Sequence, residues 1–576
     1  MSALLAAGLS ALGAQAALPA GAPTKAVSGG TDQIIIKYRE DGQKMEGLDT
    51  GISSAAMGLA QAAAERHGVT LRVARRTATR AIVAKLGQRL PEAQVEQIAA
   101  EIAQADPSVL YAEPDRIKRI MVTPNDPMFA NQWHYHEATA GMNLPLAWSQ
   151  GAGGGVTVAV IDTGYRGHAD LRGNIVPGYD FISDLAVAND GDARDGNAAD
   201  PGDWTEAGEC GGGSGASNSS WHGTHVAGTV AAVTHNGVGV AGVAYGAKVM
   251  PVRVLGKCGG YDSDIADAII WASGGSVAGV PNTTTPARVL NLSLGGSGPC
   301  GATTQAAVNS ARSRKSVVVV AAGNSGDDAS GYSPANCSGV ITVAAVGRTA
   351  DRAYYSNYGS AVEIAAPGGD QSWSETDGVL STSNAGLTTP KADSYAYYQG
   401  TSMASPHVAG AVALMLSKNL NLTPDQVLGR LRASTKPFYC SGCGSGTVDA
   451  YEAIRSATAT AVTEVEANNT YATAQVIAPT NAVVSGSISS VSDLDIYKVV
   501  VQPGHWLIAS MAPWSNASDF DLYLVSTSGS VLAKSEKSAG LTDRVTYKNN
   551  KAVAVTLYLR LVYYSTTGSY TMNVRH

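Results

Sequence analysis

The chain has 576 residues, of which 65 are glycine and 15% are charged, and its formal net charge is −7. This length exceeds what one hydrophobic core usually holds, so we expect two to four domains. A net negative charge, without a basic tract that carries interleaved aromatic residues, argues against a nucleic-acid-binding protein. The composition is typical of globular rather than disordered proteins.

The N-terminus, MSALLAAGLSALGAQAALPA, is an apolar stretch with Ala-Gln-Ala at 14–16. Such a stretch predicts a secretory signal peptide over 1–16. The lysine or arginine that usually precedes the apolar part is missing, which favours a truncated or misassigned start. A flexible Ala-rich tail is the alternative. No later run has about 18 uninterrupted apolar residues, so we expect no membrane-spanning segment and no membrane partner after signal removal.

Residues 32–120 predict a small α+β unit in the order strand, helix, strand, strand, helix, strand. This order is that of a ferredoxin-like fold. Residues 66–89 within the unit are strongly basic, whereas residues 180–203 carry seven Asp and one Arg. Two segments of opposite charge in one chain are candidates for mutual binding.

From about residue 125 to 456 the sequence contains short, continuous apolar runs such as GVTVAVIDTG and SVVVVAAGN, with helical segments between several of them. Runs that do not alternate are typical of parallel strands buried on both faces. We therefore predict an α/β domain with a doubly wound, mostly parallel sheet. In such sheets the functional groups lie at the carboxyl ends of the strands.

The small residues of 457–463 predict a linker. After it, residues 464–576 alternate apolar and polar side chains, for example in DFDLYLVS, with Gly, Ser and Asn turns between the runs. This pattern predicts an all-β sandwich.

Six cysteines lie between residues 210 and 443. An even number in one domain of an exported chain indicates disulfides. Many pairings are possible, and we favour neighbours in the sequence: Cys210 with Cys258, Cys300 with Cys337, and Cys440 with Cys443. The last pair, spaced Cys-Ser-Gly-Cys, could instead be a redox pair, but no thioredoxin-like context surrounds it. A zinc site is disfavoured because no second closely spaced pair exists.

Four polar residues are candidates for catalysis. Asp162 ends a buried strand, His222 opens the small-residue segment HGTHVAGTVAAV, and Ser402 opens an apolar helix. Asn324 ends another buried strand. Together they offer a nucleophile, a base, a carboxylate that orients the base, and oxyanion donors, including the amide of the nucleophile at a helix N-terminus. Singly, each residue is more simply explained as a turn residue or a helix cap.

The blocks VIDTG, HGTHVAGTVA and GTSMASPHVAG occur in the order Asp–His–Ser. With AAGNSG and LSLGG, they resemble the secreted bacterial subtilisin-like serine proteases (subtilases) over about 125–456. The resemblance implies a serine endopeptidase with a triad of Asp162, His222 and Ser402. Asn324 is then the side-chain oxyanion donor. One wall of the substrate cleft would be Ser293, Leu294, Gly295 and Gly296, the facing edge Gly259 and Gly260, and 330–337 would border the S1 pocket.

Two other protease classes are excluded by residues. Asp-Thr-Gly at 162–164 is also an aspartic-protease signature, but a second Asp-Ser/Thr-Gly is missing from the sequence. His-Gly-Thr-His at 222–225 lacks the His-Glu-x-x-His pattern that a zinc protease needs. A catalytically idle subtilase fold used for binding, and adhesion through 464–576, remain alternatives.

Calcium is the expected cofactor, in a structural role. The loop at 184–204 spaces Asp and Asn with Gly, and such oxygen ligands suit Ca²⁺. Its candidate ligands are Asp192, Asp195, Asn197, Asp200 and Asp203. A solvated acidic loop is the alternative. The resemblance to subtilases adds Asp170 with Asn236 as a second candidate site.

The flanking regions extend the resemblance. Residues 17–121 resemble the inhibitor-type propeptide of subtilases, which would be cut near 119–125 to release a catalytic domain over 122–456. Its basic charge suits docking on an acidic partner. Residues 464–576 resemble the bacterial pre-peptidase C-terminal domain, with a role in secretion or substrate binding, or late removal. The expected partners of this monomer are protein substrates and, transiently, its own propeptide.

Overall fold

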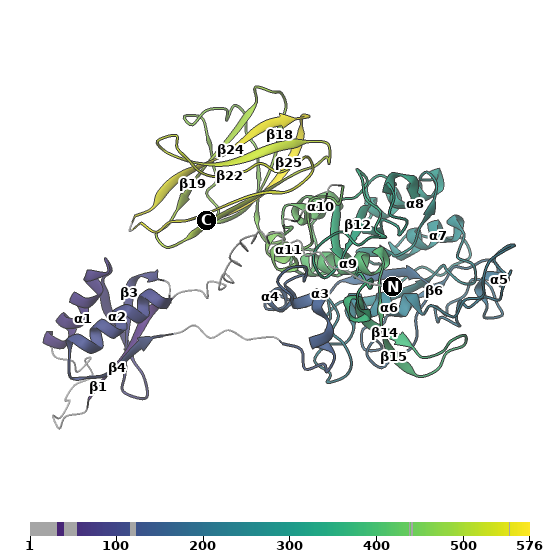
Figure 1. The fold of residues 1–576 in the computed structure, drawn as a ribbon, viewed down its shortest axis with the longest axis horizontal. Coiled ribbons are helices and arrows are strands. Elements are labelled where there is room, and N and C mark those ends of the chain that lie inside the picture. Colours follow the sequence, from purple (N-terminus) through teal and green to yellow (C-terminus); the bar gives the residue numbers. More distant parts are fainter. Residues whose placement is uncertain are drawn as a thin grey trace, which may run out of the picture. The chain divides into compact units, whose positions relative to one another are not determined.

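The computed structural model describes residues 31–39, 54–90, 92–115, 123–436, 438, 440, 442–551 and 553–576. The predicted signal peptide lies outside these residues, as does most of the predicted cleavage segment 119–125. The chain divides near residue 120 into two compact units, which are described separately (Figure 1). Within the described residues, no helix combines the length and apolar character that crossing a membrane requires.

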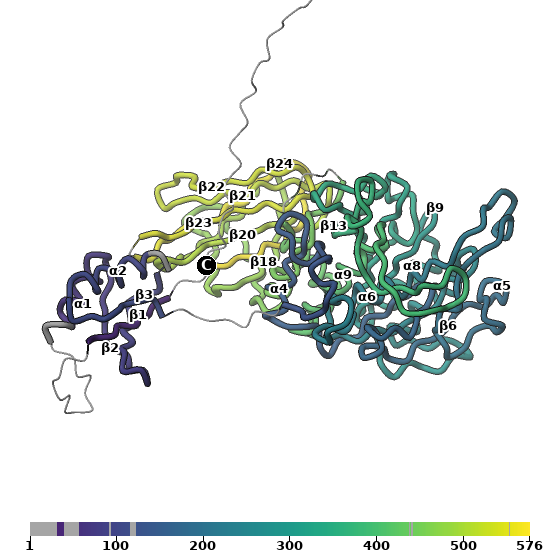
Figure 2. Tube along the Cα trace, turned by 60° about the horizontal axis from the view of Figure 1, so that its bottom comes forward, coloured from purple at the N-terminus to yellow at the C-terminus, as the bar shows by residue number. Residues whose placement is uncertain are grey.

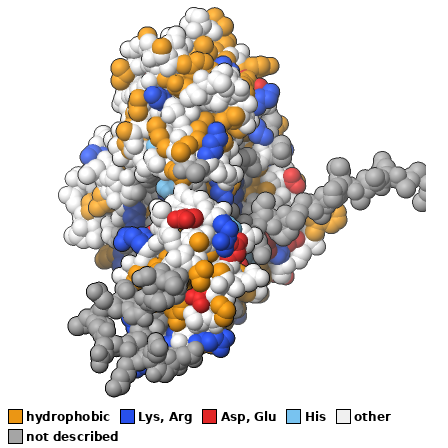
Figure 3. All heavy atoms as spheres, turned by 90° about the vertical axis from the view of Figure 1, so that its left-hand side faces the viewer, with side chains coloured by type: hydrophobic (Ala, Val, Ile, Leu, Met, Phe, Trp, Pro, Cys, Tyr) orange, Lys and Arg blue, Asp and Glu red, His pale blue; other side chains and the backbone are white. Residues whose placement is uncertain are grey.

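The first unit is a four-stranded antiparallel sheet, ordered β2-β3-β1-β4, with two helices. Its elements are β1 (Thr31–Tyr38), α1 (Ser54–Arg66), β2 (Leu71–Arg76), β3 (Ile82–Leu90), α2 (Glu92–Ala105) and β4 (Val109–Pro114). The apolar residues that recur at helical spacing in α2, such as Ile98 and Ile102, pack with Ile34 and Ile36 of β1. The predicted ferredoxin-like order is confirmed. Lys and Arg side chains are visible on the face of the molecule shown in Figure 3.

The second unit contains a parallel seven-stranded sheet, ordered β13-β12-β10-β8-β5-β7-β6. The strands are β5 (Thr157–Asp162), β6 (Tyr179–Asp180), β7 (Lys248–Arg253), β8 (Val289–Leu292), β10 (Val317–Ala321), β12 (Ile341–Val346) and β13 (Ile364–Pro367). All five residues of β10, VVVVA, are buried. The continuous apolar runs thus have the cause inferred from the sequence, because side chains on both faces of the sheet are covered.

Helices cover both faces of this sheet (Figure 1). One core contains α6 (His222–Ala231) and α9 (Thr401–Lys418), and the other contains α7 (Asp262–Ala272) and α8 (Ala302–Ser313). The other α-helices described in this domain are α3 (Trp133–His136), α4 (Leu144–Trp148), α5 (Leu185–Ala188), α10 (Pro424–Arg432) and α11 (Ala450–Ser456), and three short 3-10 helices lie at Phe129–Asn131, Ala329–Gly331 and Glu375–Asp377. Short strands outside the main sheet are β9 (Gly296–Ser297), β11 (Tyr332–Ser333), β14 (Val379–Asn384) and β15 (Asp393–Tyr398). This is the predicted doubly wound α/β domain.

The C-terminal region is a sandwich of two five-stranded sheets, whose strands run side by side in Figure 2. One sheet contains β16 (Thr460–Thr463), β18 (Asn481–Ile488), β25 (Gly568–Arg575), β20 (Trp506–Pro513) and β23 (Asp543–Lys548). The other contains β17 (Gln475–Val476), β19 (Leu494–Val501), β24 (Val555–Ser565), β21 (Asp519–Ser526) and β22 (Val531–Ser535). Strand β16 occupies part of the predicted linker at 457–463. Its residues 460–463 pair with strand β18 of the sandwich.

Candidate active site

Three adjacent parallel strands bring the predicted residues to one edge of the sheet. Asp162 is the last residue of β5, Ser293 follows β8, and Asn324 lies three residues after the end of β10. Because β10, β8 and β5 are neighbours and parallel, their carboxyl ends meet at this edge. Helices α6 and α9, which begin at His222 and Thr401, pack on the same sheet.

Asp162 and His222 form a hydrogen-bonded pair. Nδ1 of His222 lies 2.8 Å from Oδ1 of Asp162, whose side chain is fully buried. The Thr163 amide also donates to Oδ1, at 2.7 Å, while Oδ2 is buried without a hydrogen-bond partner. A proton on Nδ1 satisfies the carboxylate and leaves Nε2 as the basic nitrogen.

The charges around His222 favour its protonated form. Burial on its own lowers the pKa of His222, but the negative charge and hydrogen bond of Asp162, joined by the charges of Asp203 and Asp200, outweigh burial and raise that pKa. A base whose pKa is raised accepts a proton more readily, which suits proton abstraction from a hydroxyl.

Ser402 lies in the first turn of α9, one residue after the helix start. Its hydroxyl donates to the carbonyl oxygen of Ser293 at 3.2 Å, and the Ser293 hydroxyl donates to the Ser402 carbonyl at 2.8 Å. Within the described residues no hydrogen bond joins Ser402 to His222. The Ser402 hydroxyl is thus not directed at the imidazole, and transfer of its proton to Nε2 would require the hydroxyl to rotate, as is common in apo active sites.

Two hydrogen-bond donors flank one position beside Ser402. Oδ1 of Asn324 is occupied by the amide and the hydroxyl of Thr401, which leaves the Nδ2 group available. A Cβ atom built on Gly400 would lie 3.5 Å from Asn324 Nδ2 and 3.6 Å from the Ser402 amide nitrogen. Gly400 has φ +153°, so a glycine is favoured there. The two donors converge as an oxyanion site requires.

A cleft of about 370 Å³ adjoins His222. Of the residues predicted to border the substrate cleft, Ser293 of the strand and Gly259 of the facing edge line this cavity, together with Gly256. Leu294, Gly295, Gly296 and Gly260 are not among its lining residues. The disulfide between Cys210 and Cys258 also lines it and fixes that edge. A cleft with an exposed strand edge, such as Gly295 and Gly296, suits an extended peptide.

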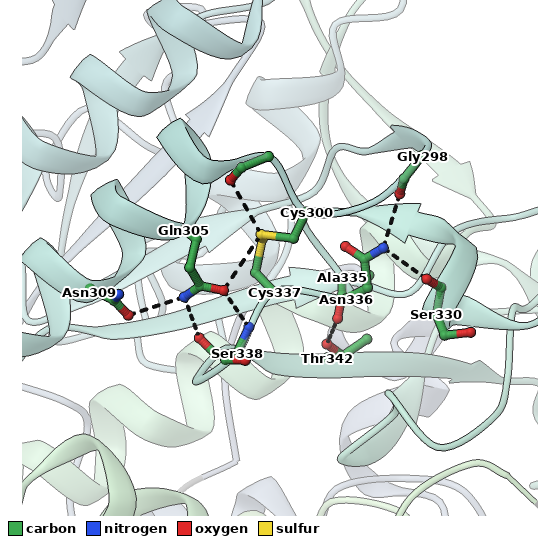
Figure 4. The surroundings of a disulfide bond; sticks show 11 residues. Gly298, Cys300, Gln305, Asn309, Ser330, Ala335, Asn336, Cys337, Ser338 and Thr342 are labelled. Atoms are coloured by element: carbon green, nitrogen blue, oxygen red, sulfur yellow. Dashed lines mark hydrogen bonds between the residues drawn. A yellow bond between two sulfur atoms is a disulfide. The ribbon is translucent and has the colours of Figure 1, made fainter.

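The segment 330–337 lies beside the predicted substrate strand. Strand β11 pairs antiparallel with β9, and Asn336 donates to the carbonyl oxygens of Gly298 and Ser330 (Figure 4). The disulfide between Cys300 and Cys337 closes the same region (Figure 4). The third disulfide joins Cys440 and Cys443. All three pairs are those favoured from the sequence.

The acidic loop 184–204 does not gather the five residues predicted to bind calcium. Asp200 accepts from the hydroxyl of Thr163, Asp203 accepts from Ser220, and Asp195 and Asn197 accept amide hydrogen bonds within local turns. The physical reason is that these four side chains are already engaged in the hydrogen bonds just described. The arginines of the region pair with other carboxylates, Arg253 of β7 with Asp180 and Asp190, and Arg194 with Asp264 and Asp267. Asp192 is exposed. We therefore do not propose these five residues as a calcium site.

The structure brings Asp170 and Asn236, the residues of the second predicted calcium site, into contact. Asn236 donates to Oδ1 of the fully buried Asp170 at 2.7 Å, and burial raises the pKa of Asp170. The charge of Asp126, a residue that the sequence did not single out, raises that pKa further, and Oδ1 of Asp126 is buried without a partner. Two buried carboxylates, one of which has an unsatisfied oxygen, fit a hard cation.

A further carboxylate cluster lies in the sandwich and was not predicted. One oxygen each of Glu464, Glu466 and Asp495 lie within 4.8 Å of one another. Asp495 is fully buried, and its burial and then its neighbour Glu464 raise its pKa. Tyr570 donates to Asp495 at 2.6 Å. The repeated Glu at 464 and 466 was the only local signal, since Asp495 is distant in the sequence.

Comparison with known proteins agrees with this geometry. A model of the subtilase family matches residues 153–473. An extracellular protease of Xanthomonas campestris pv. campestris is 49% identical over 432 residues, which are 74% of this chain and 73% of that protein. An extracellular basic protease of Dichelobacter nodosus is 42% identical over 439 residues, 74% of this chain and 71% of that protein.

Among solved structures, one described as proteases from Pseudoalteromonas arctica PAMC 21717 is 62% identical, with a TM-score of 0.58. It covers 58% of this chain and 100% of the solved chain. The region matched by the family model, residues 153–473, contains Asp162, His222, Asn324 and Ser402.

Proposed function

Because this chain belongs to the subtilase family and is a secreted serine endopeptidase, we propose that it cleaves peptide bonds through Asp162, His222 and Ser402. The observation that carries this assignment is the 2.8 Å contact between Asp162 and His222 at the sheet edge where Ser402 lies in the first turn of α9. Family membership supplies the reaction class, and this contact supplies the base and its orienting carboxylate.

The proposed reaction uses four groups in sequence. His222 Nε2 takes the proton of Ser402, whose oxygen attacks the peptide carbonyl. The Ser402 amide and Nδ2 of Asn324 bind the oxyanion that forms, and the buried Asp162 stabilises the imidazolium. His222 then gives its proton to the leaving amine. Water repeats the sequence to release the acyl group from Ser402.

Covalent labelling by a fluorophosphonate tests the nucleophile. Wild-type protein should be labelled once, and Ser402→Ala should not be labelled. Ser405→Ala is the matched control, because Ser405 is in the same helix but is buried and donates to Asn291 at 2.8 Å. It should be labelled like the wild type. Labelling that persists in Ser402→Ala would overturn the assignment.

The chain organisation is also proposed. Residues 17–121 act as an inhibitory propeptide removed near 119–125, and 464–576 form a separate C-terminal domain after the catalytic region 122–456. The compact four-stranded unit and the exposed Arg72, Arg75, Arg76 and Arg80 support docking on an acidic surface. Residues 17–121, added to mature enzyme, should inhibit it with slow onset. No inhibition at micromolar concentration would contradict this role.

Calcium is proposed as a structural cofactor held by Asp170 and Asn236, with Asp126 as an added ligand. To bind it, the Asn236 amide would turn its oxygen, which accepts from the Val238 amide in this structure, toward the ion. The cation would offset the repulsion between the two buried carboxylates and fix the segments that carry them. A chelator should therefore lower the thermal midpoint of Ser402→Ala protein, and excess Ca²⁺ should restore it. In Asp126→Asn protein the effect of the chelator should be smaller. An unchanged midpoint in chelator would contradict the proposal.

A further inference from the structure

The helix that carries His222 begins without an ordinary cap. Trp221, the residue before it, is left-handed at φ +50° and gives no side-chain hydrogen bond to the helix. The first amides of a helix have no acceptor within the helix itself. At α6 these are the amides of His222 and Gly223, so the exact placement of the imidazole depends on acceptors from elsewhere.

Two hydroxyl groups supply those acceptors. The His222 amide donates to the hydroxyl of Ser220 at 3.2 Å, and the Gly223 amide donates to the hydroxyl of Thr163 at 3.0 Å. Thr163 directly follows Asp162. The two hydroxyls thus connect the helix start both to its own preceding turn and to the strand that holds the orienting carboxylate.

Each hydroxyl is oriented by one carboxylate of the loop before α6. Ser220 donates to Oδ2 of Asp203 at 2.6 Å, and the Ser220 amide donates to Oδ1 at 2.6 Å. Thr163 donates to Oδ2 of Asp200 at 2.9 Å. A hydroxyl that donates to a carboxylate must present its lone pairs elsewhere, here to the helix amides.

We propose that Asp203 and Asp200 are positioning residues for catalysis, which fix the start of α6 through Ser220 and Thr163, and that Asp203 also places negative charge behind His222. This inference rests on the proposed role of His222 as the general base. It assigns a purpose to two carboxylates that the sequence alone suggested as calcium ligands.

The surrounding charges agree with this role. His222 faces Asp162 from β5, Asp200 and Asp203 from the loop, and His225 on its own helix. Tyr398 of β15 donates to the Ser220 carbonyl at 2.8 Å. Burial and then the charge of Asp203 raise the pKa of Asp200 to about 7, against the positive charge of Arg253. The Arg166 side chain donates to the Asp200 carbonyl oxygen. Of the two loop carboxylates, Asp203 raises the pKa of His222 more than Asp200 does.

The loop is anchored so that it can hold a fixed geometry. Cys210 is bonded to Cys258 across the cleft edge, and Lys257 pairs with Glu209 at 2.8 Å. The Lys257 ammonium also lies 3.8 Å from the centre of the Trp204 ring, next to Asp203. Asp200 itself is 1% exposed. Asp200 and Asp203 therefore belong to a loop that a disulfide, an ion pair and a cation–π contact hold in place.

The test compares pH profiles of kcat/KM on a peptide substrate, normalised by fluorophosphonate titration of active sites. Asp203→Asn keeps an acceptor for the Ser220 amide but removes the charge, so the pKa of His222 should fall. The acid limb should move to lower pH by about 0.5 unit, less than the roughly 1–3 units of a direct ion pair. Ser220→Ala keeps the charge, so kcat should fall up to about 10-fold with the acid limb unmoved.

Glu206→Gln is the matched control, because it removes an exposed charge three residues from Asp203. Its profile should overlay the wild type. An Asp203→Asn profile that overlays Glu206→Gln would overturn the inference. If Asp203→Asn protein does not fold, Asp200→Asn takes its place, with a smaller shift in the same direction expected. Failure of the wild type to label would instead overturn the proposed function, so the two failures are distinguishable.

Discussion

Asn324 accepts two hydrogen bonds from Thr401 through a single oxygen, from its amide and its hydroxyl, both at 2.9 Å. These bonds fix which end of the Asn324 amide faces the substrate. Asn324→Ala should lower kcat by about 10²–10³-fold with little change in KM, which is the loss known for removal of the side-chain oxyanion donor of a subtilisin, a member of the same family.

Thr401→Val tests the orientation of the Asn324 side chain separately from its ability to donate a hydrogen bond to the oxyanion. It removes one of the two bonds to Oδ1 but leaves the Asn324 amide in place, so kcat should fall less than in Asn324→Ala. Steady-state kinetics of both variants, corrected for the labelled fraction, provide the measurement. Equal kcat values for Asn324→Ala and wild type would exclude Asn324 as an oxyanion donor.

Gly400→Ala should damage the same site by filling it. The added methyl group would lie in van der Waals contact with both proposed oxyanion donors, 3.5 Å from Asn324 Nδ2 and 3.6 Å from the Ser402 amide nitrogen, at a residue whose φ of +153° favours glycine. We expect kcat to fall at least about 10-fold, because both donors are obstructed. Gly196→Ala, at a position with open space around it, is the control for adding a methyl group. Full activity of folded Gly400→Ala would contradict the placement of the oxyanion site.

A structural feature was predictable from the sequence where its cause is local, and it was not predictable where the residues that interact lie far apart in the sequence. The sheet was predictable because strands such as β10 are buried on both faces, which leaves a continuous apolar run in the sequence. Asp162, His222 and Ser402 were predictable because each lies in a distinctive block at a strand end or helix start.

The loop at 184–204 shows why other residues were not predictable. Its spacing of Asp, Asn and Gly resembles a cation-binding loop, yet Asp203 accepts hydrogen bonds from Ser220, and Asp190 pairs with Arg253, 63 residues away in the sequence. Local spacing carries no information on such a partner. The same is true of Asp200, whose contact with Thr163 exists only after the sheet has formed.

The disulfide between Cys210 and Cys258 should matter for both stability and substrate binding. It closes a sequence separation of 48 residues, which corresponds to about 4 kcal/mol of chain entropy in the unfolded state. Replacing both cysteines by Ala in Ser402→Ala protein should lower the free energy of unfolding by up to that amount, as measured in guanidinium chloride. In active protein the same change should raise KM, because the bond lines the cleft.

The disulfide between Cys300 and Cys337 offers a comparison of similar size, with a separation of 37 residues. Its removal should cost nearly as much stability, about 4 kcal/mol. This bond does not line the cleft beside His222. Its removal should therefore raise KM less than removal of the bond between Cys210 and Cys258. Identical kinetic effects of the two double substitutions would argue that both act only through stability.

The stability of the C-terminal sandwich should fall as pH rises. Burial raises the pKa of Asp543 to about 8, and it raises the pKa of Asp521 to about 6 with help from Asp519. A carboxyl whose pKa is higher in the folded than in the unfolded state binds its proton more tightly when folded. The stability that Asp543 contributes to the folded state is therefore fully present below about pH 4, and it is lost as pH rises through about 8.

Urea unfolding of Ser402→Ala protein between pH 5 and 9, followed by the fluorescence of tryptophans that include Trp506 and Trp514 of the sandwich, measures this slope. Asp543→Asn should make the slope shallower, because the amide does not ionise, while Asp521 and Asp495, whose pKa values burial also raises, keep part of it. Glu536→Gln is the control, since hydrogen bonds from Lys534 and Tyr523 lower the pKa of exposed Glu536. It should leave the decline between pH 5 and 9 in place. A slope that is unchanged in Asp543→Asn would show that another group controls the pH dependence.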